Sequence, residues 1–205
     1  MKKIFLSILC LTAISFSFAQ TADEIVNKHI DAIGGAEAWK KVNSIITTGT
    51  ILVQGAEVGV TQTVLNGQGS RQDISLMGMN GYQIITPTQG WNFMPFQGQK
   101  IPEPVTADDL KEAQEQLDAQ GTLIDYKVKG HTIELLGKDD IDGAEAYKLK
   151  ETLKSGKVQT LFIDPKTYYL IRAISKQKAN GKEVDVTTNL SNYKKTRLNA
   201  GLPEK

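Results

Sequence analysis

A long succession of short β-type segments separated by turn residues constrains the fold of this chain more than any other feature. The first segments run from Ser44 to Met94, are rich in β-branched and apolar residues, and are divided by turns that contain Gly, Asn and Gln. Connections this short favour an antiparallel meander over a parallel arrangement. We expect five strands here, including one from Arg71 to Met79, and a hairpin turn at Asn80-Gly81.

A second set of β-type segments follows between His131 and Tyr193, again separated by residues that favour turns. Three of its carboxylates, Asp139, Asp140 and Asp142, belong to a predicted solvated hairpin turn, although a calcium or acid site is the alternative interpretation. About five strands in this set bring the total to about ten. Together with the helical segments, they predict an α+β domain with one large, strongly curved antiparallel sheet.

Three segments have helical rather than β-type periodicity. Thr21-Ala-Asp-Glu24 forms a capping box at the start of the first helix, which is predicted to end at Gly34-Gly35. A short second helix is predicted over residues 36–42, with Trp39 as a core anchor rather than a ligand contact. The third predicted helix, residues 106–120, has only a narrow apolar stripe and is therefore held lightly. It acts either as a lid or as a cover over one sheet edge.

The segment from Arg71 to Pro95 is apolar on both faces of its predicted strands and rich in aromatic residues, which make up only 7% of the whole chain. Side chains alternate between the two faces along a strand, so a sheet that is apolar on both faces must be covered on both by protein or by a ligand. We predict that this segment forms the wall of an apolar cavity. An ordinary sheet core beneath a helix is the alternative. The predicted lining residues are Met77, Met79, Tyr82, Trp91, Phe93 and Phe162.

Arg71 is predicted to lie at the rim of this cavity. Its guanidinium group is suited to a phosphate or to an acyl-linked head group. The alternative is an exposed strand arginine that pairs with Asp73.

The first 19 residues have the pattern of a secretory signal. A short basic start precedes an apolar run, and small residues stand at the last and third-last positions of the segment. We expect cleavage after Ala19 and a single mature domain over residues 20–205. The sole cysteine, Cys10, lies inside the apolar run without the small residue that lipoprotein processing places before it. We therefore predict no lipid anchor and, in the mature protein, no disulfide or thiolate metal site.

Charge balance and motif content argue against several functional classes. The chain has 24 Lys and Arg against 23 Asp and Glu, which gives no reason to expect a nucleic-acid partner. No later apolar run approaches the roughly 20 residues needed for a transmembrane helix. His29 and His131 lack metal-ligand partners at short spacing, and there is no nucleophile elbow, phosphate loop or dinucleotide fingerprint. We predict no metal, no cofactor and no enzyme activity; catalysis by scattered residues is the alternative.

Several segments together resemble the LolA-like superfamily of periplasmic proteins, which includes lipoprotein carriers and related lipid-binding or sensor domains. The resemblance rests on residues 22–35 with Trp39, on residues 90–95 (GWNFMP), on residues 164–168 (DPKTY), and on Asn192-Tyr193 ahead of residues 201–203 (GLP). It implies an unclosed antiparallel β-barrel, or half-barrel, of about ten strands with helices covering its concave face. It also implies that acyl chains bind in the apolar space between barrel and helices.

Comparable family members continue into further strands after the Gly-Leu-Pro segment, whereas this sequence stops there. We expect either a compact variant or a domain shortened at its C-terminus. A shortened half-barrel leaves an open sheet edge, which favours association with another chain.

These observations predict a periplasmic protein that buries an acyl lipid, or the acyl chains of a lipoprotein, in its half-barrel. A carrier in outer-membrane lipoprotein sorting is one such role. Each methylene moved from water to an apolar pocket contributes roughly 0.8 kcal/mol, so no specific polar chemistry is required. The alternative is an envelope sensor or interaction domain that uses the same fold with a protein partner. Such sensors usually carry a second domain or a membrane helix, which favours the binding protein.

Overall fold

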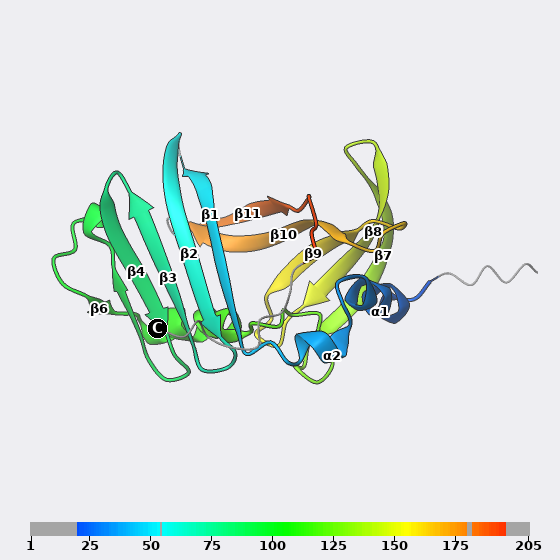
Figure 1. The fold of residues 1–205 in the computed structure, drawn as a ribbon, viewed down its shortest axis with the longest axis horizontal. Helices are drawn as coiled ribbons and strands as arrows, with labels where there is room; N and C mark the ends of the chain where they lie inside the picture. Colours follow the sequence, from blue (N-terminus) through cyan, green and yellow to red (C-terminus); the bar gives the residue numbers. More distant parts are fainter. Residues whose placement is uncertain (1–19, 54, 180–181, 196–205) are drawn as a thin grey trace, which may run out of the picture.

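The computed structural model describes residues 20–53, 55–179 and 182–195 of the chain. It shows two antiparallel sheets side by side, with the helices along one side of them (Figure 1). The predicted signal segment, residues 1–19, and residues 201–203 of the family resemblance lie outside the described residues. Within the described part, no helix is long and apolar enough to cross a membrane.

The first sheet has six strands that follow one another in chain order, and every neighbouring pair is antiparallel. This arrangement confirms the predicted antiparallel meander and adds a short sixth strand. The strands are β1 (Ser44–Val53), β2 (Ala56–Leu65), β3 (Gly69–Leu76), β4 (Met79–Ile85), β5 (Gly90–Phe93) and β6 (Glu103–Pro104).

The second sheet has five strands in the order β11-β10-β9-β8-β7, also antiparallel throughout. The strands are β7 (Thr132–Ile141), β8 (Ala144–Thr152), β9 (Val158–Ile163), β10 (Leu170–Ala179) and β11 (Lys182–Asn189). The predicted open α+β architecture is confirmed. The single curved sheet is instead divided in two, because no strand of one sheet pairs with a strand of the other in the described part of the chain.

Three α-helices and two 3-10 turns complete the described elements: α1 (Ala22–Ala32), α2 (Ala36–Trp39), α3 (Ala107–Ala113), η1 (Pro95–Gln97) and η2 (Gln114–Leu117). The capping box of α1 is present, since Thr21 Oγ1 accepts from the Glu24 amide at 3.2 Å and the Thr21 amide donates to Glu24 Oε2 at 2.9 Å. The third helix ends well before the predicted Gln120, because its last turn tightens into η2.

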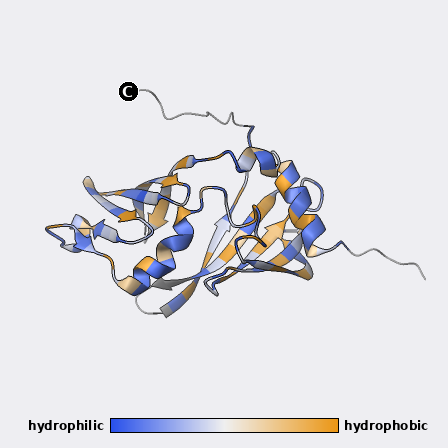
Figure 2. Ribbon diagram, turned by 90° about the horizontal axis from the view of Figure 1, so that it is seen from below, coloured by the Kyte–Doolittle hydropathy of each residue, from blue (hydrophilic) through white to orange (hydrophobic). Residues whose placement is uncertain are grey.

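The helices cover the inner faces of the two sheets. Figure 2, which views the molecule from below relative to Figure 1, shows hydrophilic and hydrophobic residues in alternation along α1. Ile25, Val26 and Ile30 of α1 pack against Leu149 and Leu161 of the second sheet.

The first sheet has two smaller core clusters. In one, Ala113 and Leu117 pack against Ile85, which makes α3 and η2 a cover over the sheet face. In the other, Val42 and Val64 pack around Ala119. The interior is therefore divided into separate packed regions rather than filled by one core.

The hairpin predicted at Asn80-Gly81 lies three residues earlier, at Met77-Gly78. Both turn residues have positive φ angles, 50° and 78°, as a two-residue turn of this kind requires. Gly81 lies inside β4 instead, and an added Cβ there would stand 2.7 Å from the Phe93 carbonyl oxygen and 2.8 Å from the Phe96 ring. The glycine is therefore needed for close packing of η1 on the strand, which the sequence signal does not distinguish from a turn.

The hairpin predicted from Asp139, Asp140 and Asp142 is confirmed. Asp142-Gly143 forms its turn, with φ angles of 55° and 87°, and Asp140 accepts a hydrogen bond from the Gly143 amide. Asp139 pairs with Lys148 at 2.9 Å, and Asp142 pairs with Arg172 at 2.7 Å. Asp139 and Asp142 are therefore paired with cationic side chains of the same sheet.

Two strand glycines provide a matched test of this packing. Gly81→Ala should destabilise the fold by about 1–3 kcal/mol, because its Cβ overlaps backbone and ring atoms that cannot all move away. Gly59→Ala should be neutral or stabilising by about 0.5–1 kcal/mol, because its Cβ makes only an ordinary 3.6 Å contact with Ser75. Urea unfolding midpoints measure both. Equal midpoints for the two variants would contradict the close approach at Gly81.

Candidate functional site

A cavity of about 470 Å³ lies between the two sheets. Its walls come from β1 and β2 of the first sheet, from β9 and β10 of the second, and from α1 and α2. Residues 118–130, here called the crossing segment, connect η2 to the second sheet through a series of turns and close one side of the cavity. The cavity size falls within the range of roughly 300–1,000 Å³ typical of small-molecule sites.

Much of the cavity wall is apolar, and the apolar side chains come from every element that borders it: Ile33, Trp39, Ile45, Val64, Leu161 and Leu170. Trp39 packs against two of the three core clusters, and its indole N–H donates to the Ile33 carbonyl at 3.0 Å. Because that donor is satisfied, the ring offers the cavity an apolar surface. Trp39 is thus both a core residue and a lining residue.

His29 of α1 lines the cavity and is only 5% exposed. Its Nδ1 lies 2.8 Å from the Tyr168 carbonyl oxygen, so Nδ1 carries a proton and donates. Burial lowers the pKa of the imidazole below its usual value, and the Tyr168 carbonyl opposes this only in part. His29 is therefore neutral at physiological pH, and its Nε2 is a hydrogen-bond acceptor.

The turn that positions Tyr168 belongs to the DPKTY motif. Asp164 Oδ1 accepts from the amides of Lys166 and Thr167 at 2.8 and 2.7 Å, which fixes the turn between β9 and β10. These bonds, led by that of Thr167, lower the pKa of Asp164. Tyr168 then adopts a positive φ of 58°, and its carbonyl faces His29. The motif thus holds the second sheet to α1 beside the cavity.

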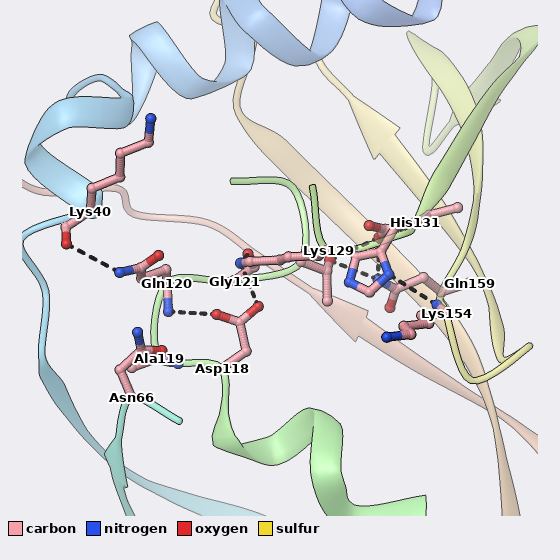
Figure 3. A network of polar contacts seen from close by, with 12 residues as sticks. Lys40, Asn66, Asp118, Ala119, Gln120, Gly121, Lys129, His131, Lys154 and Gln159 are labelled. Carbon is pink, nitrogen blue, oxygen red and sulfur yellow. Dashed lines mark hydrogen bonds and ion pairs between the residues drawn. The ribbon is translucent and has the colours of Figure 1, made fainter. Parts of the chain in front are cut away.

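The crossing segment is held at both ends by polar contacts (Figure 3). The Ala119 amide donates to Asn66 Oδ1 of the first sheet's β2–β3 turn at 3.1 Å, and Gln120 Nε2 donates to the Lys40 carbonyl at 3.2 Å. Lys129 Nζ lies 2.7 Å from Asp118 Oδ2, which closes the segment on itself. These contacts fix a stretch of backbone that has no regular secondary structure.

A buried acidic residue lies next to the part of the cavity wall formed by the crossing segment and β9. Glu151 of β8 is 0% exposed, and its Oε2 accepts from Thr122 Oγ1 at 2.9 Å and from Gln159 Nε2. Its Oε1 has no hydrogen-bond partner among the described residues. Burial raises the pKa of this carboxyl above its usual value, although Gln159 and Thr122 partly offset the effect.

Four of the sequence-predicted site residues lie on the other face of the first sheet. Tyr82 and Phe93 are paired in register, with ring centroids 5.8 Å apart, and the Arg71 guanidinium lies 4.8 Å from the Tyr82 ring centroid. Arg71 also makes an ion pair with Asp73 at 2.6 Å, as its alternative interpretation expected. Trp91 pairs with Ile84 on the same face. Because faces alternate, this face is opposite to Val64 and Ile85, which point inward.

The remaining three predicted residues also lie away from the cavity. Met77 is 82% exposed in its hairpin turn, and Met79 is 41% exposed at the start of β4. Phe162 is buried on the outer face of the second sheet, paired in register with Lys148 and Arg172. None of the seven residues lines the cavity between the sheets. Ligand binding by them stays a prediction.

Sequence reasoning missed most of the residues that do line the cavity. The crossing segment contributes Thr122 and the apolar pair Leu123 and Ile124, which show neither helical nor strand periodicity. Its only local signal is the pair of glycines at 121 and 130, both with positive φ. His29, Trp39 and Leu161 were assigned from periodicity to a helix, a core and a strand, and the structure brings them together.

Within the described residues, no group of three or more His, Cys, Asp or Glu side chains is placed to hold a metal ion. His131, the second histidine, accepts a hydrogen bond from the Lys154 amide through Nδ1 at 3.0 Å. It therefore ties the start of β7 to the β8–β9 turn.

Comparison with models of known protein families and with curated proteins finds no match. Solved structures with a similar arrangement include a LolA superfamily protein of Nitrosomonas europaea, with a TM-score of 0.49 and 16% identity over 87% of this chain and 80% of that one. A domain assigned to outer membrane lipoprotein sorting, from Vibrio parahaemolyticus, has a TM-score of 0.45 and 14% identity over 84% and 78% of the two chains. Lipoprotein LppX of Mycobacterium tuberculosis has a TM-score of 0.33 and 14% identity over 75% and 88%.

These matches include members of the superfamily that the sequence resembles. At such identities and TM-scores they say nothing about ligand or activity. Any function must be argued from the chain's own residues.

The neutral state of His29 predicts a loss of stability in acid. Its folded-state pKa is depressed, so its contribution is present above the usual value of 6.5 and is lost as the pH falls through the folded value. His29→Asn keeps a donor for the Tyr168 carbonyl but cannot titrate. The variant should lose less stability than the wild type between about pH 7 and pH 5 in urea unfolding. Equal losses would show that other groups dominate the acid response.

Glu151 predicts the opposite trend. Its folded-state pKa is raised, so the protonated carboxyl stabilises the fold at low pH, and this contribution is lost as the pH rises through the folded value. Glu151→Gln should therefore gain stability relative to the wild type as the pH rises from about 4 to about 8 in thermal melts. Glu134→Gln, at an exposed strand position, is the control and should show no such trend. A flat difference for Glu151→Gln would mean that the buried acid is not desolvated as described.

Proposed function

We propose that this protein binds a lipid in the periplasm by burying an acyl chain in the cavity between its two sheets. The observation that carries the proposal is the cavity itself: a space of about 470 Å³ with apolar walls, bordered by two separate core clusters that do not fill it. A cavity of this size between packed elements lowers stability unless something occupies it. An apolar chain is the simplest occupant of walls made by Ile45, Val64, Leu161 and Leu170.

Burial of an acyl chain supplies free energy of the same order as the cost of association. Burial contributes roughly 0.8 kcal/mol per methylene, so about 14 methylenes give on the order of 11 kcal/mol before the cost of association, about 4–15 kcal/mol, is subtracted. Partial burial of a chain therefore gives weak to moderate affinity and allows release. Reversible burial of this kind suits a protein that holds lipid for a time rather than one that stores it.

The proposed cargo is a free acyl lipid or the acyl chains of a lipoprotein, since either presents the same hydrocarbon to the cavity. In the second case the protein is a carrier in outer-membrane lipoprotein sorting and requires an envelope partner to receive the cargo. The proposed periplasmic location depends on the secretory pattern of the first 19 residues. Organic extraction of the protein purified without detergent, followed by mass spectrometry, distinguishes the two cargoes.

Trp39 offers a direct test, because it lines the cavity and is one of only two tryptophans in the chain. In a Trp91→Phe variant, which changes only the outer face of the first sheet, Trp39 becomes the sole tryptophan. A brominated acyl chain should then quench its fluorescence saturably. The blocking variant is Ala173→Phe, which places a ring in the cavity from β10.

Ala173→Phe should weaken chain binding by at least about tenfold, equivalent to 1.4 kcal/mol. Ile174→Phe on the same strand points to the opposite face and serves as the control, with affinity unchanged. Absence of quenching in the Trp91→Phe protein would overturn the proposal. Equal effects of the two phenylalanine variants would place the chain elsewhere on the molecule.

A further inference from the structure

The polar part of the cavity wall carries no positive charge. Among the lining residues that the structure describes there is no Lys or Arg, and the one carboxylate, that of Asp118, is paired with Lys129 at 2.7 Å. Lys129 also donates to the Gly121 carbonyl at 2.8 Å, so it is already held by two acceptors of the crossing segment. The other polar lining groups are neutral: His29, Thr47, Gln62, Gln116, Gln120, Thr122 and Gln159.

Glu151 determines which hydrogen-bonding atoms of Thr122 and Gln159 remain available to a ligand. Thr122 donates its hydroxyl proton to Glu151 Oε2 at 2.9 Å, and Gln159 Nε2 donates to the same carboxyl and to Thr122 Oγ1, the latter at 3.3 Å. The donors of both side chains are therefore used inside the protein. What remains for a ligand is acceptor capacity, on the Thr122 oxygen and the Gln159 carbonyl oxygen.

His29 adds a third acceptor to the same cavity. Its Nδ1 proton is committed to the Tyr168 carbonyl at 2.8 Å, which leaves Nε2 with a lone pair. Side chains from α1, from the crossing segment and from β9 thus present the cavity with acceptors.

We propose that the cavity selects acyl lipids with an uncharged head group that donates hydrogen bonds, as a hydroxyl or an amide N–H does. Thr122, Gln159 and His29 accept these hydrogen bonds, and Glu151 is a positioning residue that orients Thr122 and Gln159. The inference rests on the proposed lipid-binding function. A mono- or diacylglycerol has the required chemistry, and so does the amide of an N-acylated chain.

Charged head groups are disfavoured for a physical reason. A carboxylate or phosphate loses its hydration on entry and cannot bond to the acceptors of Thr122, Gln159 and His29. The described lining contains no Lys or Arg, so the desolvation is not offset by a cationic partner. An ammonium group could donate to the same acceptors, but it carries the larger desolvation cost of an ion into a site whose one lining carboxylate is already paired. A neutral donor loses least on entry and donates to the acceptors of Thr122, Gln159 and His29.

The test compares three ligands that share one acyl or alkyl chain: monolauroylglycerol, laurate and dodecylamine. Each competes with a brominated chain for quenching of Trp39 in the Trp91→Phe protein at neutral pH, where laurate is ionised and the amine is charged. Monolauroylglycerol should bind at least about tenfold more tightly than either charged ligand. Gln62→Lys, which introduces a cation into the β2 wall away from Glu151, should reverse the preference toward laurate.

Gln68→Lys adds the same charge at an exposed turn outside the cavity and should leave the preference unchanged. Laurate or dodecylamine binding as tightly as monolauroylglycerol would overturn the head-group inference while leaving acyl binding intact. Failure of every ligand to displace the brominated chain would also overturn it. Absence of quenching by the brominated chain itself would overturn the proposed function.

Discussion

The crossing segment, residues 118–130, holds the two halves of this molecule in place. Ala119 packs with the Val42 and Val64 cluster beside the first sheet, whereas Leu123 and Ile124 pack beneath α1 in the cluster of the second sheet. No strand pairs across the two sheets in the described part of the chain. These side-chain contacts therefore connect the two sheets, as backbone hydrogen bonds do in a continuous barrel. The spacing of the sheets, and with it the cavity, depends on this irregular stretch.

Division of the core has a thermodynamic consequence. Three separate clusters and an intervening cavity bury less apolar surface than a single core of the same residues would, and the fully buried Glu151 adds a desolvation cost at neutral pH. Natural proteins accept such costs mainly where function requires them. Here both costs fall on the same wall, because Glu151 bonds to the lining residues Thr122 and Gln159. The fold is therefore destabilised next to the space that a ligand is proposed to fill.

The first sheet shows that an aromatic segment can lie on the face away from the cavity between the sheets. Tyr82, Trp91 and Phe93 suggest a cavity wall, yet register pairing sets them on the outer face, where Tyr82 contacts Phe93 and Arg71. The inner face of the same strands carries Ile85 under α3 and Gly81 under Phe96. A hairpin at Met77-Gly78 rather than Asn80-Gly81 decides this register. Both dipeptides contain glycine, and only the packing of Phe96 shows which glycine must lie in the strand.

Features that depend on neighbouring residues could be predicted from the sequence: the capped α1, most of the short turns, the antiparallel order of successive strands and the α+β class. These features follow from backbone conformation and side-chain periodicity within a few residues. The sequence does not reveal where the sheet divides, which face of each strand is inner, or how His29, Trp39, Thr122 and Leu161 come to share one cavity. The physical reason is that these features arise from contacts between segments far apart in the chain. The segment that makes many of those contacts has no period for a sequence pattern to reveal.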